Sequence, residues 1–121
     1  ASSFLKVVVA DGTTTSAPAL ALPEVAGAIA RQTDDPGVAD KAVSFLRRQD
    51  WVRVAVLDDV LAASAASLAA QQRLRGADAV YLALAMKDTG PLITLDAEML
   101  KRAPAGVQVF TPGGWLAQTR G

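Results

Sequence analysis

The chain has 121 residues, in which 12 lysines and arginines balance 12 aspartates and glutamates, and it contains neither cysteine nor histidine. The length fits one domain with one hydrophobic core. Balanced charge predicts no general attraction to nucleic acid or to an anionic membrane, so such binding requires a local patch. Without cysteine and histidine there are no disulfides, thiolate zinc sites, iron–sulfur clusters, imidazole metal sites or Ser-His-Asp triads. Catalysis would need carboxylates, hydroxyls, lysine or arginine, or a hard metal ion held by oxygen atoms.

The apolar residues indicate a folded protein outside the membrane. Hydrophobic residues make up 51% of the chain and aromatic residues 5%, which favours thin helices packed on a sheet over an aromatic stacking surface. No apolar segment approaches the ~20 residues that span a bilayer. The N-terminal residues also lack the basic start and apolar core of a signal peptide. The sequence therefore predicts a cytoplasmic location and no membrane partner.

The first elements follow from turn signals and hydrophobic spacing. Residues 4–11, FLKVVVAD, fit a strand by their valines and a helix by their spacing, and the sequence leaves this choice open. Residues 17–22, APALAL, predict a short strand, and LPEVAGAIARQ predicts a helix with proline in its first turn. Asp35 and Pro36 then mark the start of a second helix, which we expect to reach about Gln49.

The middle of the chain predicts a strand followed by two helices. Residues 52–57, VRVAVL, are β-branched and predict a strand. Asp58 opens an alanine-rich helix that we expect to extend to about Arg75. Gly76 separates it from a helix at residues 77–87 that is apolar almost all round, which indicates burial.

The last part completes an alternation of strands and helices. Residues 91–95, PLITL, predict a strand, AEMLKRA predicts a short helix, and residues 107–110, VQVF, predict a final strand. Such alternation is typical of right-handed crossovers and of a mainly parallel sheet with helices on both faces. We therefore expect a three-layer α/β fold, in which ligands bind at the carboxyl ends of the strands.

Three acids lie at junctions between the predicted elements. Asp78 follows Gly76 at a helix start and Glu24 follows Pro23 in a first turn, so each fits a helix cap as well as a ligand. Asp96 directly follows a predicted strand, where a cap and a ligand role are equally reasonable. The recurrence of this position favours a shared site at one rim of the sheet.

A cluster of these carboxylates would require a cation. Neighbouring carboxylates repel each other and raise each other's pKa unless a cation or a shared proton is present. In a chain without histidine or cysteine, the suitable cations are Mg²⁺ and Mn²⁺, which prefer carboxylates and water. Such an ion lowers the pKa of a coordinated water and offsets charge on a phosphoryl group. The pattern thus indicates metal-dependent phosphodiester cleavage.

Further polar residues are candidates for supporting roles. Thr94 lies two residues before Asp96 and faces the same side of the strand, where its hydroxyl could orient the carboxylate or a water, although β-propensity explains it equally well. Basic residues on the predicted helices could form a phosphate-binding rim for RNA, or could be ordinary surface charges. These basic candidates are Arg31, Arg73, Arg75 and Arg102.

The segments LPEVAGAIAR, RLRGADAVYLALA and GPLITLD, in this order, resemble the PIN domain of bacterial VapC-type toxins. The resemblance covers residues 3–115, and RGADAVY followed by TLD is its most specific part. It implies a Mg²⁺- or Mn²⁺-dependent ribonuclease, a hydrolase that is usually a homodimer and is inhibited by an antitoxin. It also implies that Glu24, Asp78 and Asp96 are the metal-binding and catalytic acids.

The chain departs from the family pattern at its start. Family members begin with a strand that ends in another metal-binding aspartate, and no such strand precedes Glu24 at the usual distance. Asp11 is too near Glu24 for that role, and the resemblance favours a helix for the residues around it. We therefore expect residues 1–121 to form a single PIN-like domain that is incomplete at the N-terminus. A longer natural chain, recruitment of residues 4–11 as a strand, or a second copy would each fill the gap.

Overall fold

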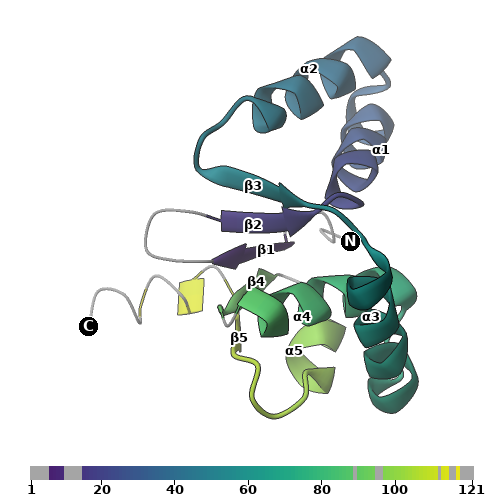
Figure 1. Ribbon diagram of the computed structural model, residues 1–121. Coiled ribbons are helices and arrows are strands. Elements are labelled where there is room, and N and C mark those ends of the chain that lie inside the picture. The colour runs from purple at the N-terminus through teal and green to yellow at the C-terminus, as the bar shows by residue number, and fades with distance from the viewer. Residues whose placement is uncertain are drawn as a thin grey trace.

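The computed structural model describes residues 6–9, 15–88, 90–94, 97–111, 113, 114 and 117. It is a mixed α/β structure, and Figure 1 shows its strands between two groups of helices. In chain order the elements are β1 (Lys6–Val9), β2 (Thr15–Pro18), α1 (Ala21–Thr33), α2 (Pro36–Arg47), β3 (Val52–Ala55), α3 (Asp59–Gln72), α4 (Gly76–Asp88), β4 (Leu92–Thr94), α5 (Ala97–Arg102) and β5 (Val109–Phe110).

The strands form one sheet in the order β3-β2-β1-β4-β5. β2 pairs with β3 and β4 with β5 in parallel, whereas β1 is antiparallel to both of its neighbours. Val8 lies opposite Ser16 of β2 and opposite Leu92 of β4, so these two strands are level with each other. β2, β3, β4 and β5 therefore run in one direction, and the carboxyl ends of β2 and β4 lie at the same edge.

The central strand β1 decides between the two options that the sequence left for residues 4–11. Lys6–Val9 forms a strand, so the helix favoured by the family resemblance is wrong for these four residues. Three consecutive valines suit a strand, and the N–H and C=O groups of β2 and β4 would lack partners on their inner sides without β1. Recruitment of this segment into the sheet is thus what the structure shows. Asp11 lies outside the described residues.

The predicted elements are present, with shifted ends. The first predicted strand, residues 17–22, is β2 at Thr15–Pro18, because the chain turns at Leu20 and α1 already begins at Ala21. The alanine-rich helix ends at Gln72 instead of Arg75. It ends there because Arg73 adopts a left-handed conformation with φ 55° that is typical of a helix C-cap.

Two aspartates cap helices as their positions predict. The Asp35 Oδ1 atom accepts hydrogen bonds from the backbone N–H of Gly37 at 2.9 Å and of Val38 at 3.4 Å, at the start of α2. The Asp58 Oδ1 atom accepts one from the backbone N–H of Leu61 at 2.8 Å, at the start of α3. Both acids satisfy N–H groups that have no partner inside the helix.

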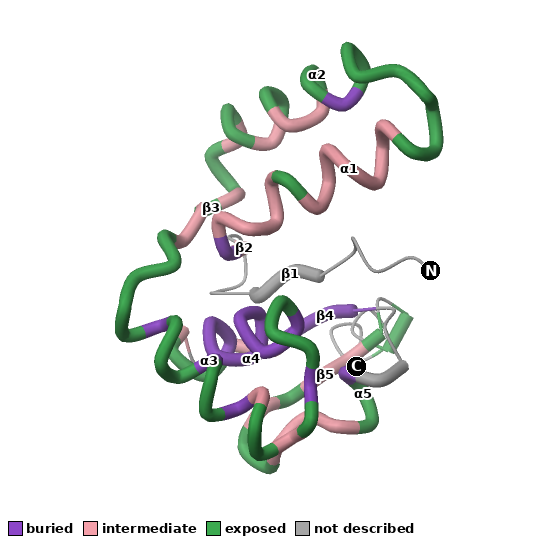
Figure 2. The backbone as a smooth tube through the Cα atoms, turned by 90° about the vertical axis from the view of Figure 1, so that its right-hand side faces the viewer, coloured by how far each residue is buried: buried purple, intermediate pink, exposed green. Residues whose placement is uncertain are grey.

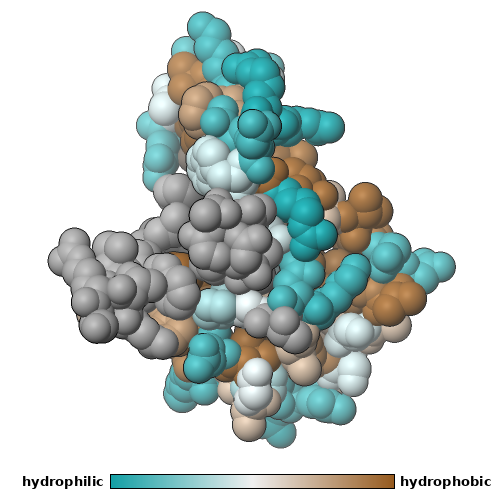
Figure 3. Space-filling model, turned by 60° about the vertical axis from the view of Figure 1, so that its left-hand side comes forward, coloured by the Kyte–Doolittle hydropathy of each residue, from teal (hydrophilic) through white to brown (hydrophobic). Residues whose placement is uncertain are grey.

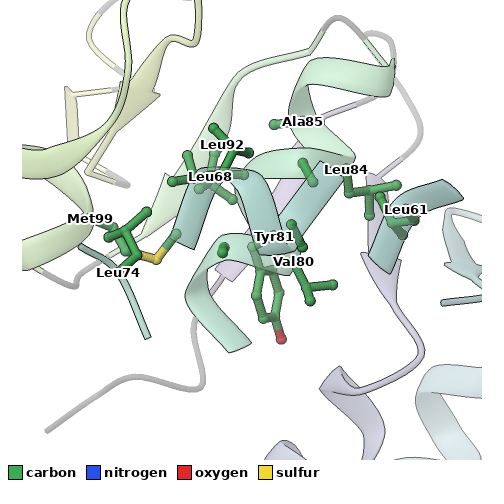
Figure 4. Packing of buried hydrophobic residues seen from close by; sticks show 13 residues of the cluster. Leu61, Leu68, Leu74, Val80, Tyr81, Leu84, Ala85, Leu92 and Met99 are labelled. Atoms are coloured by element: carbon green, nitrogen blue, oxygen red, sulfur yellow. The ribbon is translucent and has the colours of Figure 1, made fainter. Parts of the chain in front are cut away.

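The hydrophobic core is centred on α4. Every residue from Asp78 to Ala85 is buried, and Figure 2 shows this helix as the most continuous buried segment of the chain. α4 packs against α3 and against β1, β2 and β4. Figure 4 shows the labelled side chains of this core; its larger members include Leu61, Leu68, Leu74, Tyr81, Leu82, Leu84, Leu92 and Met99. The burial predicted for this helix is confirmed.

The other helices are less buried. α1 packs chiefly on α2, α1 has no buried residue, and this pair reaches the sheet through contacts of α2 with β3. The helical layer on the second face of the sheet, which the sequence predicts, therefore stays a prediction. In the part of the chain that the structure describes, no helix combines the length and the apolar character needed to cross a lipid bilayer.

Candidate active site

Asp78 lies in the first turn of α4, as the sequence predicts. The residue is only 3% exposed, and its Oδ2 atom is 3.3 Å from Nε of Arg75, which precedes the helix. A buried carboxylate requires a counter-charge or hydrogen bonds, and the N-terminal end of a helix also favours a negative charge. Arg75 itself has a side chain that is 74% exposed. Asp78 is thus a buried carboxylate that is paired with an arginine exposed to solvent.

Glu24 is brought to the same helix by Tyr81. Glu24 lies in the first turn of α1, and its Oε1 atom accepts a hydrogen bond of 2.7 Å from the hydroxyl of Tyr81. Tyr81 is 1% exposed. In Figure 4 its ring extends from the apolar cluster and its oxygen points away from that cluster. This contact joins residues that are 57 positions apart in the sequence.

The two acids act on one hydroxyl group. Tyr81 follows Asp78 by three residues, so the two side chains lie on the same side of α4. Burial raises the pKa of Tyr81 above its ordinary value, and the hydrogen bond to Glu24 and the negative charges of Glu24 and Asp78 raise this pKa further. Glu24 of α1 therefore contacts the residue of α4 that lies three positions after Asp78.

The third predicted acid, Asp96, lies outside the described residues. Thr94, two positions earlier, is fully buried at the end of β4, at the sheet edge where β2 also ends. α1 begins three residues after the end of β2, so the first turn of α1, which contains Glu24, follows that edge of the sheet. The proximity of Asp96 to the other acids, and the orienting role of Thr94, remain predictions.

The chemistry of the described donors fits a hard divalent cation. Carboxylate oxygens of Glu24 and Asp78 are ligands that Mg²⁺ and Mn²⁺ prefer. Mg²⁺ commonly binds through one or two carboxylates and keeps several waters. Within the described ranges, no group of three or more acidic side chains lies close enough to hold a metal ion. A set of three acidic ligands therefore needs a side chain outside those ranges, and Asp96 is the one that the sequence predicts.

Three of the four predicted basic residues lie at, or contact, the connection between α3 and α4. Arg102 of α5 donates a hydrogen bond from its Nη1 atom to the backbone oxygen of Arg73 at 2.8 Å. Arg75, two residues further along, pairs with Asp78. By contrast, Arg31 lies in the last turn of α1, seven residues after Glu24, which is about 10 Å along a helix. Arg73, Arg75 and Arg102 thus form a candidate basic rim at the connection between α3 and α4, whereas the guanidinium of Arg31 lies beside Gly27 of α1.

A shallow apolar groove lies beside Glu24. Its volume is about 560 Å³. Its lining residues come from the start of α1, the segment before α3, α3 itself and the start of α4: Leu20, Pro23, Glu24, Leu57, Ala62, Ala65, Ala66, Ala69, Gly76, Ala77 and Val80. On the face shown in Figure 3, hydrophobic patches lie among hydrophilic residues over the part of the surface that the structure describes. Glu24 is the acidic group at an otherwise apolar groove.

The sequence analysis did not single out Tyr81 or the groove. The spacing of Tyr81 three residues after Asp78, in a helix predicted to be buried, was an available signal, because a buried phenol needs a hydrogen-bond partner. The alanines of α3 gave no comparable signal, because their exposure depends on how α1 and α4 pack. Comparison with family models, with curated proteins and with solved structures finds no match to this chain.

Proposed function

We propose that this chain is a PIN-type, three-layer α/β domain that acts as a metal-dependent ribonuclease. The observation that carries the proposal is the hydrogen bond from the buried Tyr81 hydroxyl to Glu24, which joins the carboxylate of α1 to the helix that carries Asp78. A capping role explains each acid separately, but it does not require Glu24 to contact α4. The motifs RGADAVY and TLD support the same proposal by their resemblance to the PIN family.

In this proposal Glu24, Asp78 and Asp96 hold Mg²⁺ or Mn²⁺. When bound, the ion supplies a water of lowered pKa and offsets negative charge on the phosphate. The chain's own residues bind and orient the substrate. Arg73, Arg75 and Arg102, beside Asp78, attract the RNA backbone. Thr94 is a further supporting residue, whose hydroxyl orients Asp96 or a water.

The test is cleavage of labelled RNA by the purified protein with Mg²⁺, with Mn²⁺ and with EDTA. Loss of a residue that only supports a metal ligand commonly reduces activity about 10–100-fold, so Asp78→Asn and Glu24→Gln should reduce cleavage by at least about 100-fold. Asp59→Asn is the matched control, since it removes an exposed acid in the first turn of a different helix. Cleavage that survives EDTA, or that persists in both site variants, would refute the proposal.

A second candidate is a PIN-fold binding module that pairs with an antitoxin-like protein and lacks efficient catalysis. The apolar groove of about 560 Å³ beside Glu24 favours it, because such a surface can bind an apolar segment of a partner. A ligand that binds the folded state raises the melting temperature. Absence of both Mn²⁺ stabilisation and RNA cleavage in the wild-type protein would favour this candidate over the first.

The remaining features of the proposal concern the setting of the protein. Its substrate, cellular RNA, places it in the cytoplasm, and the family resemblance suggests a homodimer. Sedimentation equilibrium over a range of protein concentrations tests the dimer directly. A monomer at all concentrations would remove the dimer from the proposal without affecting the ribonuclease assay.

A further inference from the structure

The helix that carries Glu24 is weakly anchored in the core. α1 has no buried residue and packs mainly on α2. Asp78, by contrast, belongs to α4, in which every residue from Asp78 to Ala85 is buried. A site that uses both acids must therefore join a half-buried helix to the most buried helix of the protein. A contact between the two helices at the level of the acids would provide that connection.

Tyr81 provides this contact. Its ring is buried with the apolar cluster of α4, and its hydroxyl reaches Oε1 of Glu24 at 2.7 Å. We propose that Tyr81 is a positioning residue of the metal site, which holds one oxygen of Glu24 so that the carboxylates of Glu24 and Asp78 meet a divalent cation together. This inference rests on the proposed function and adds a residue that does not itself bind the metal.

The hydrogen-bonding capacity of the phenol suits this role. A phenol has one proton to donate, and here the proton is donated to one oxygen of Glu24. The second oxygen of Glu24 and the remaining lone pairs are left for a cation. Tyr81 is also neutral, so it orders the carboxylate without competing electrostatically with the metal, as a lysine or arginine in its place would. Partners of this kind orient metal ligands in many proteins.

The spacing in α4 adds a second constraint. Asp78 and Tyr81 are three residues apart on one rigid helix, so the position of the phenol relative to Asp78 is fixed by helix geometry. When the phenol also fixes Glu24, the separation of the two acids is set by α4 rather than by the packing of α1. Removal of the hydroxyl should therefore affect metal binding more than folding.

The experiment measures Mn²⁺ binding in the absence of RNA, by the free-ion signal in electron paramagnetic resonance. The proteins are the wild type, Tyr81→Phe, Glu24→Gln and the double variant. Tyr81→Phe keeps the ring, and we expect it to weaken Mn²⁺ binding about 10-fold, as does the loss of other residues that hold a metal ligand in place. In the Glu24→Gln background the same change should have no further effect, because the two residues act through one contact.

Leu61→Val is the control for a merely structural effect. Leu61 is 3% exposed in the core and lies on α3, away from the hydroxyl contact. We expect this variant to lower the melting temperature by a few degrees and to bind Mn²⁺ like the wild type. In RNA cleavage, Tyr81→Phe should need about 10-fold more Mn²⁺ for half-maximal rate and should recover the wild-type kcat at saturating Mn²⁺, with the KM for RNA unchanged.

The outcomes separate this inference from the proposed function. Wild-type protein that binds no Mn²⁺ and cleaves no RNA refutes both. If the wild type binds and cleaves but Tyr81→Phe has the same Mn²⁺ affinity, the positioning role is wrong and the ribonuclease proposal stands. An equal loss of affinity from Tyr81→Phe with and without Glu24→Gln also overturns the role, because the effect would then not pass through Glu24.

Discussion

The raised pKa of Tyr81 predicts a loss of stability at alkaline pH in the metal-free protein. In the folded state, burial and the neighbouring charges of Glu24 and Asp78 keep the phenol protonated above its ordinary pKa. The phenol of an unfolded chain ionises at about pH 10. Above that pH the unfolded state binds fewer protons than the folded state, so the free energy of unfolding decreases as pH rises.

The magnitude follows from one proton. Each pH unit above about 10 should lower the free energy of unfolding by about 1.4 kcal/mol, so the loss is about 1.4 kcal/mol at pH 11 and about 2.7 kcal/mol at pH 12. Below the pKa of the unfolded phenol this contribution is fully present. Urea unfolding of wild type and of Tyr81→Phe in EDTA, from pH 8 to pH 12, measures the difference; lysine ionisation affects both proteins equally.

The chain has a single tyrosine, so tyrosinate absorbance reports on Tyr81 alone. In the wild type, we expect tyrosinate to appear together with the loss of secondary structure, not before it. Glu24→Gln removes a negative charge beside the hydroxyl and should allow ionisation at lower pH. Ionisation of the wild-type tyrosine at about pH 10, with circular dichroism unchanged, would show that the phenol is neither buried nor close to the acids.

Four substitutions test the helices around the site by urea denaturation. Asp58→Ala should lower the free energy of unfolding by about 1 kcal/mol, because the first turn of α3 loses its side-chain cap; an unchanged midpoint would contradict the cap. Leu84→Ala, in the core of α4, should lower it by about 2–5 kcal/mol, whereas Val60→Ala, at a residue that is 75% exposed, should change it by less than about 0.5 kcal/mol. Similar effects of these two would mean that α4 is not the core helix. Arg75→Gln should cost less than about 1 kcal/mol, because the arginine is mostly in solvent and the N-terminal end of α4 also stabilises the carboxylate of Asp78; a larger loss would show that Asp78 depends on this pair alone.

The helices could be predicted because their signals are local. Asp35 and Asp58 precede helices and accept hydrogen bonds from the first backbone N–H groups of those helices. Gly76 follows the end of α3 within a few residues. Capping of this kind depends on residues within one turn. The strand β1 was not determined in the same way, since its valines fit two periodicities. Its conformation is fixed by pairing with β2 and β4, and β4 is more than 80 positions away.

The candidate site shows the same division. The junction positions of Glu24 and Asp78 could be read from the sequence, because turns and capping residues mark the ends of elements. The contact of Glu24 with Tyr81 could not, because it depends on how α1 lies against α4. The pair formed by Arg53 of β3 and Asp88 of α4 is a further contact of this type, with 2.7 Å between Nη2 and Oδ2. Spacing predicts the side of a helix, but not the element that this side contacts.

The direction of β1 also determines what the central strand contributes to the proposed metal site. A parallel central strand would end at the edge where β2 and β4 end, whereas the antiparallel β1 begins there, and its Lys6 lies opposite Thr94. The family resemblance implies another acid at this place, where β1 has Lys6 instead. The proposed site therefore contains three carboxylates, from Glu24, Asp78 and Asp96. Ca²⁺ takes about 6–8 oxygen ligands, whereas Mg²⁺ usually keeps several waters and binds through one or two carboxylates. A set of three acids is therefore sufficient for Mg²⁺ or Mn²⁺ and poor for Ca²⁺. This set of three acids favours the same ions that phosphodiester cleavage needs.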